Sequence, residues 1–163
     1  MRFLCALMIF LIASANALAH DEEVAMVSTK RLTLSTAIKI ARAAVAECTG
    51  RGIQIGVTVV DREGIVQVTL RDTIAAQITV PISERKAFTA ANFNSATSAL
   101  ADRADSPIGR AAGLLMAAGG LPIEIGGSLV GAVGVSGAPS GETDEECAQA
   151  GLDAVMDDLE MAM

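Results

Sequence analysis

Few residues of this chain have the types and spacing that catalysis requires. The single histidine is His20, and a Ser-His-Asp or Cys-His arrangement would need it to reach back into the fold from a point before the first predicted helix. The adjacent carboxylates Asp144, Glu145 and Glu146 could hold a metal ion. Thr143 followed by Glu146 is better interpreted as a capping box at a helix start. The sequence therefore predicts a protein without an enzymatic activity of its own.

Two cysteines, Cys48 and Cys147, have the potential for covalent chemistry. Neither lies in a Cys-x-x-Cys motif or beside a histidine, which argues against a structural zinc site. Cys48 falls in the last turn of the first predicted helix and Cys147 in the first turn of the last one. These two helix ends meet if the helices pack side by side and antiparallel on one face of a sheet. A Cys48–Cys147 disulfide and two buried free thiols both fit this pattern.

Residues 1–19 have the organisation of a secretory signal peptide. Arg2 supplies a positive charge, residues 3–13 are apolar, and Ala17 and Ala19 occupy the small positions of a cleavage site. The apolar run is too short to span a bilayer, although an uncleaved anchor is the alternative. We expect cleavage before His20, a periplasmic or secreted protein, and no membrane span in the mature chain.

Acidic side chains outnumber basic ones throughout the sequence. Lys and Arg number 12 against 19 Asp and Glu, a formal charge of −7, and loss of Arg2 with the signal peptide makes the mature chain one unit more negative. Such a surface repels nucleic acid and anionic lipid. The composition therefore predicts no nucleic-acid partner.

Hydrophobic periodicity and turn residues predict three helices and two β-hairpins. The expected helices cover residues 33–50, residues 82–100 with Ser83 as N-cap, and a last stretch capped by Thr143; the expected strands cover residues 54–60, 65–71, 121–125 and 128–135. Gly126 and Gly127 supply the positive φ angles of a two-residue hairpin turn. After a flexible lead at residues 20–31, this order predicts one α+β domain at residues 32–163, with helices packed on a mostly antiparallel sheet.

Four segments in this order resemble the GlcG/HbpS family of small haem-associated proteins. They are VTVVDREG at residues 57–64, KAFTAA at 86–91, GGLPIEIGGSLVGAVGVSG at 119–137 and DEECAQAG at 144–151. The resemblance implies a profilin-like fold, assembly into homo-oligomers and binding of haem or another tetrapyrrole. It also implies a relation to the C-terminal domain of the corrinoid-processing protein PduO.

The KAFTAA segment supplies the first candidate ligand residues that this resemblance implies. Lys86 and Thr89 are three residues apart on one helix face, so Thr89 is the candidate metal ligand, through its hydroxyl oxygen, and Lys86 could pair with a haem propionate. The alternative is a surface lysine beside a threonine bonded to its own helix backbone. Phe88 and Phe93 could flank the macrocycle, or they could belong to the core.

Two further candidates lie at strand ends. Arg71 follows the first hairpin and is a second candidate for a propionate. Ser136, before Gly137, could offer backbone amides to an anion, whereas the alternative is a plain turn.

The sequence as a whole predicts an exported haem-binding protein that acts in carriage, sequestration or sensing. An overall apolar content of 52% favours a homo-oligomer. The first alternative is an accessory subunit without cofactor that serves a periplasmic enzyme or sensor. The second is an enzyme acting on a small carboxylate.

Overall fold

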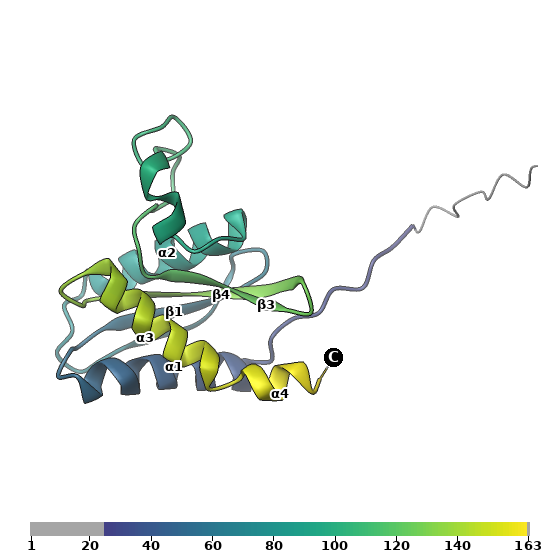
Figure 1. The fold of residues 1–163 in the computed structure, drawn as a ribbon, viewed down its shortest axis with the longest axis horizontal. Coiled ribbons are helices and arrows are strands. Elements are labelled where there is room, and N and C mark those ends of the chain that lie inside the picture. The colour runs from purple at the N-terminus through teal and green to yellow at the C-terminus, as the bar shows by residue number, and fades with distance from the viewer. Residues whose placement is uncertain (1–24, 163) are drawn as a thin grey trace, which may run out of the picture.

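The protein is an α+β domain built on a four-stranded antiparallel sheet, as the sequence predicts (Figure 1). The computed structural model describes residues 25–162, so the proposed signal peptide and its cleavage site lie outside the described residues. The strands are β1 (Gly56–Asp61), β2 (Val66–Arg71), β3 (Gly120–Ile125) and β4 (Ser128–Ser136), in the spatial order β2-β1-β4-β3. The helices are α1 (Leu34–Gly50), α2 (Thr79–Phe93), the 3-10 helix η1 (Ser98–Arg103), α3 (Gly141–Asp153) and α4 (Met156–Glu160).

The two predicted hairpins form the two halves of the sheet. β1 pairs with β2 and β3 pairs with β4, and the halves join through the antiparallel ladder between β1 and β4. Gly126 and Gly127 have φ angles of 56° and 76°, so the β3–β4 turn has the positive φ angles predicted for it.

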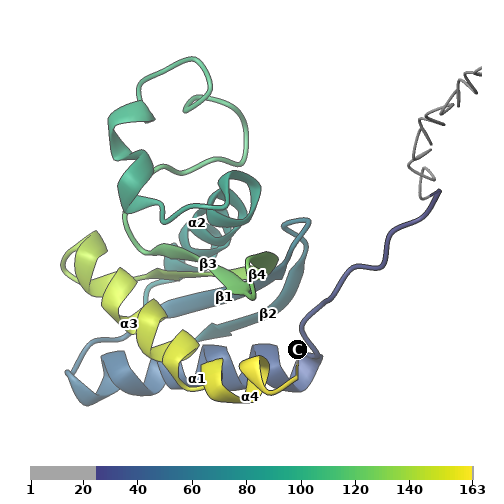
Figure 2. The ribbon, with the colours of Figure 1, turned by 45° about the vertical axis from the view of Figure 1, so that its right-hand side comes forward.

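Helices cover both faces of the sheet (Figures 1 and 2). α1 and α3 run antiparallel on one face, where aliphatic side chains of both helices and all four strands form the main core. α2 covers the other face and approaches closely at Gly134, where an added Cβ would lie 2.1 Å from the Ser83 carbonyl oxygen. The sheet is therefore buried on both sides, with small residues where α2 lies against it.

An arm of the chain between α2 and β3 stands away from the sheet (Figure 2). It contains η1 and has a small core of its own, in which Leu100, Leu114 and Met116 contact Phe88 and Phe93. The base of the arm is closed where the Gly120 amide donates to the Thr97 hydroxyl over 2.8 Å. The arm is thus a fixed part of the fold.

The second helix differs from its prediction at both ends. It begins at Thr79, because Pro81 falls in the first turn, where no amide donor is required. It ends at Phe93, since Asn94 takes a left-handed conformation with φ of 45°. Ser83 is not the N-cap: it lies inside the helix, buried, with its hydroxyl bonded to the Val80 carbonyl.

The last helix also begins differently from the prediction. Ser140 is the N-cap, because its hydroxyl accepts from the Thr143 amide over 3.2 Å. The predicted capping box of Thr143 and Glu146 is therefore wrong. The helix starts earlier, at Gly141, and is interrupted at Ala154 before α4.

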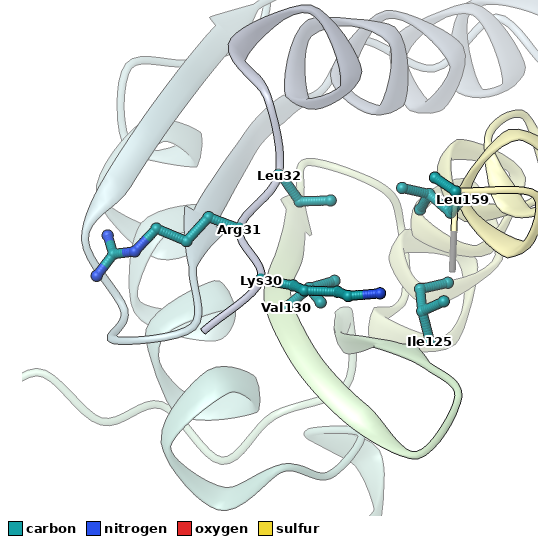
Figure 3. A pocket seen from close by; sticks show the side chains of 7 residues that line it. Lys30, Arg31, Leu32, Ile125, Val130 and Leu159 are labelled. Atoms are coloured by element: carbon teal, nitrogen blue, oxygen red, sulfur yellow. The ribbon is translucent and has the colours of Figure 1, made fainter. Parts of the chain in front are cut away.

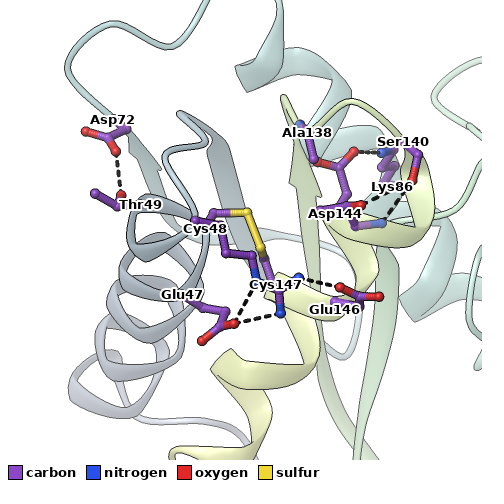
Figure 4. Close-up of a disulfide and its surroundings, with 12 residues drawn as sticks. Glu47, Cys48, Thr49, Asp72, Lys86, Ala138, Ser140, Asp144, Glu146 and Cys147 are labelled. Atoms are coloured by element: carbon purple, nitrogen blue, oxygen red, sulfur yellow. Dashed lines mark hydrogen bonds and ion pairs between the residues drawn. A yellow bond between two sulfur atoms is a disulfide. The ribbon is translucent and has the colours of Figure 1, made fainter.

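A disulfide joins Cys48 of α1 to Cys147 of α3, with Cα atoms 5.7 Å apart (Figure 4). The antiparallel packing of the two helices brings these distant residues together, as the sequence-based argument requires. Arg51, just after α1, adds ion pairs to Glu47 and Glu146 beside the bridge. Among residues 25–162, no helix is both long and apolar enough to cross a membrane.

Candidate functional site

Lys86 projects from the inner face of α2 and is buried. Its Nζ donates to Asp144 Oδ2 over 2.8 Å and to the Val135 carbonyl over 2.9 Å (Figure 4). The other carboxylate oxygen, Oδ1, accepts from the Ala138 amide over 2.9 Å. Lys86 is therefore engaged by the protein itself, and this geometry does not present it to a propionate.

Thr89 is also committed to the fold. Its hydroxyl donates to the Arg85 carbonyl over 2.7 Å and accepts from the Leu115 amide over 2.8 Å, and the residue is fully buried. The hydroxyl thus links α2 to the arm, and the interpretation of Thr89 as an iron ligand does not fit this arrangement.

Phe88 is one of two predicted site residues that line a groove, the other being Arg71. Gly64 in the β1–β2 turn and Gly113 in the arm lie beside its ring, and both have positive φ angles. A Cβ added to Gly64 would lie 2.7 Å from the ring, so the turn reaches Phe88 only because it has no side chain there. Glu84 and Arg85 complete the lining of this groove, which has a volume of about 240 Å³. We call it the Phe88 groove.

Arg85 is a site residue that sequence reasoning missed. It is exposed, and its guanidinium group donates to the Leu114 carbonyl over 2.5 Å. Arg85 and Phe88 are three residues apart, so they share one helix face. The sequence therefore contains the spacing that pairs Arg85 with Phe88. The prediction missed Arg85 because the KAFTAA segment that resembles the family begins one residue later, at Lys86.

The other predicted residues lie elsewhere. Phe93 contacts the arm, and the Arg103 guanidinium stacks over its ring at 5.1 Å from the centroid. Arg71 lies at the end of β2 and lines a different groove, together with Arg42 on α1. Ser136 is buried at the end of β4. The structure does not bring Arg71, Ser136 and Phe88 into one site.

The sequence indicates only two roles for Asp144, in a helix cap or as a metal ligand. In the structure burial raises the pKa of its carboxyl group, and the hydrogen bonds from Lys86 and the Ala138 amide offset this only in part. Within the described part of the chain, no cluster of three His, Cys, Asp or Glu side chains could hold a metal ion. Asp144 is therefore a partner for Lys86 and not part of a metal centre.

A larger cavity of about 320 Å³ lies where the two ends of the described chain meet the β3–β4 hairpin (Figure 3). Its lining residues come from the lead, the hairpin and the C-terminal end: Lys30, Arg31, Leu32, Ile125, Val130, Leu159 and Ala162. None of them was a predicted site residue. We call it the terminal cavity.

These features define a small α+β domain with surface grooves, and the sequence comparison assigns its family. A family model described as "Haem degrading protein HbpS-like" matches residues 32–153. The chain belongs to this HbpS-like family, as the four motif segments predict. A comparison with curated proteins finds no match.

Solved structures agree with this assignment. A double mutant of HbpS from Streptomyces reticuli is 41% identical, with a TM-score of 0.76 over 80% of this chain and 90% of that one. The Klebsiella pneumoniae protein ORFY is 26% identical, with a TM-score of 0.75 over 80% of this chain and 94% of that one. PduOC, solved as a complex with heme, is 26% identical, with a TM-score of 0.71 over 77% of this chain and 95% of that one.

Proposed function

We propose that this protein binds haem or a related tetrapyrrole and acts in its carriage, sequestration or sensing. Membership of the HbpS-like family and the likeness to the PduOC:heme complex support this proposal. The observation in this chain that carries it is the Phe88 ring, which lies half-buried between two glycines with a guanidinium group beside it.

The residues of the Phe88 groove fit the chemistry of haem at one edge. The Phe88 ring provides an apolar aromatic surface for a macrocycle, and Arg85 provides a planar cation for a propionate. Glu84 would offer carboxylate oxygens to the iron of a bound haem, and that haem would supply ligand-binding or redox chemistry. A volume of about 240 Å³ is below the usual range of about 300–1,000 Å³ for enclosed ligand sites, so the macrocycle would lie partly outside the groove.

A haemin titration followed by ultraviolet–visible spectroscopy tests the proposal. We expect a shifted Soret band with a saturable endpoint, and Phe88→Ala should weaken binding about tenfold, because burying one aromatic side chain is worth about 1.5–3 kcal/mol. Arg85→Gln should also weaken binding. Phe93→Ala and Arg103→Gln are matched controls on the neighbouring ring and cation, and circular dichroism checks that each variant is folded.

Three results would each count against parts of this proposal. No Soret shift in the wild type would refute haem binding and favour an accessory subunit without cofactor. An equal loss in the Phe93→Ala control would refute the Phe88 groove as the site. Since the family description names haem degradation, the complex should also be followed with a reductant present; progressive loss of the Soret band, faster than for free haemin, would replace carriage with degradation.

The cellular setting is part of the same proposal. We propose that the protein is exported and that its mature form begins at His20, because Ala17 and Ala19 form a signal-peptidase site. N-terminal sequencing of the periplasmic fraction tests this, and a retained Met1 would refute it. We also propose a homo-oligomer, which light scattering tests; a monomer mass at micromolar concentration would refute it.

A further inference from the structure

We propose that the terminal cavity binds a medium-chain aliphatic carboxylate, a ligand distinct from haem and a site distinct from the Phe88 groove. The first argument is the nature of its walls. Leu32, Ile125 and Val130 are buried, Leu159 is half-buried, and all four side chains are aliphatic (Figure 3). Walls of this kind favour a saturated hydrocarbon chain over a polar ligand.

The second argument is that the cavity is preformed by fixed segments. The Arg31 guanidinium points away from it and is held by Asp61 and Glu63 at 3.0 and 2.9 Å. The Leu32 carbonyl accepts from the Gln67 side-chain amide over 3.1 Å. Contacts therefore hold the lead on both sides of Leu32, which lowers the entropy cost of ordering this wall when a ligand binds.

The third argument is charge. Lys30 extends across the cavity toward the side of Ile125 and Leu159 (Figure 3). Its ammonium group therefore lies beside the aliphatic walls of the cavity, in a protein whose formal charge is −7. Lys30 has a contact of its own in the structure, so a ligand carboxylate would join or replace that contact. An aliphatic chain with one carboxylate end complements this combination of surfaces.

The size of the cavity sets the length of the ligand. At roughly 30 Å³ for a water-sized group, a volume of about 320 Å³ accommodates on the order of ten heavy atoms, as in octanoate. Because each buried methylene is worth about 0.8 kcal/mol, affinity should rise about fourfold per added carbon until the cavity is full.

Isothermal titration of the mature protein with hexanoate, heptanoate, octanoate, decanoate and dodecanoate tests the proposal. We expect saturable binding that strengthens with chain length and levels off near octanoate. Octanol, which has the same chain without the charge, should bind about tenfold more weakly, since it cannot pair with Lys30. Lys30→Gln should remove this preference for octanoate over octanol, whereas Arg42→Gln, which changes an exposed cation on α1, should retain it.

A second variant separates ligand binding from effects on folding. Ala162 lines the cavity and is exposed, so Ala162→Trp should fill the space and abolish octanoate binding while leaving the urea midpoint unchanged. Octanoate binding that survives Ala162→Trp, or affinity that does not depend on chain length, would overturn the proposal. Binding to acyl chains only in phospholipid vesicles would also overturn it. The haemin titration of Ala162→Trp should match the wild type, so failure of either proposal leaves the other testable.

Discussion

Lys86 on α2 and Asp144 on α3 form a buried ion pair that connects the helices of opposite faces at the end of β4. Nζ and Oδ2 are 2.8 Å apart, and the two side chains are 6% and 5% exposed. Nζ of Lys86 also donates to the Val135 carbonyl, and the Ala138 amide donates to Oδ1 of Asp144. Both charges are therefore paired and hydrogen-bonded, as burial requires.

Breaking this pair should be costly, whereas removing both charges should not. We expect Lys86→Met to lower the free energy of unfolding by about 3–5 kcal/mol, because it leaves the Asp144 carboxylate buried without its partner. Lys86→Met combined with Asp144→Leu should recover most of the loss. Urea denaturation measures both. Lys39→Met is the control, since the exposed Lys39–Asp158 pair should be worth no more than about 1 kcal/mol. Equal losses in the single and double variants would contradict the pairing argument.

Asp144 should also give stability a defined pH dependence. Burial raises its pKa in the folded state above the unfolded value, so the folded protein holds this proton more tightly than the unfolded chain does. Its contribution to stability is then fully present below the unfolded pKa of about 3.9 and is lost as pH rises through the folded pKa. The stability of the wild type relative to Asp144→Asn should therefore decline in urea titrations as the pH rises above the unfolded pKa of about 3.9. A difference that increases with pH would show that the ion pair outweighs burial.

The Cys48–Cys147 bridge should make a large contribution to stability. It spans a sequence separation of 99, for which the chain-entropy model predicts about 4–5 kcal/mol. Reduction of the wild type should lower the urea midpoint accordingly. The Cys48→Ala/Cys147→Ala variant should unfold at one midpoint with or without reductant. A wild-type midpoint that is insensitive to full reduction, verified by thiol titration, would contradict this prediction.

Gly134 should not tolerate a side chain. An added Cβ would lie 2.1 Å from the Ser83 carbonyl and 2.5 Å from the Ala87 amide nitrogen, both in the backbone of α2. We expect Gly134→Ala to destabilise the protein by about 1–3 kcal/mol or more, since helix and sheet must separate. Gly50→Ala is the control: Gly50 is the last residue of α1, and an added Cβ there would have no atom within 4 Å, so this variant should not be destabilised. Thermal unfolding of both variants measures the contrast.

Local signals determined the parts of this protein that depend on neighbouring residues. The alternation of residues 121–125 and 128–135 and the two glycines between them predict the β3–β4 hairpin, because turn geometry and side-chain alternation act over a few residues. The apolar spacing of residues 33–50 predicts α1 for the same reason. The order of these elements with the four motif segments was enough to indicate the fold and the family.

Only the tertiary structure decided which polar groups remain available to a ligand. Lys86 and Asp144 are 58 positions apart in the sequence. The position of each residue in its own helix fits an exposed lysine or a capping carboxylate as well as it fits a buried ion pair. Their burial depends on how α2 and α3 meet at the end of β4. For the same reason the sequence does not reveal the terminal cavity, whose walls come from the β3–β4 hairpin and from segments near both ends of the described chain. Burial and long-range pairing arise from packing between elements, and residue type and local spacing do not encode them.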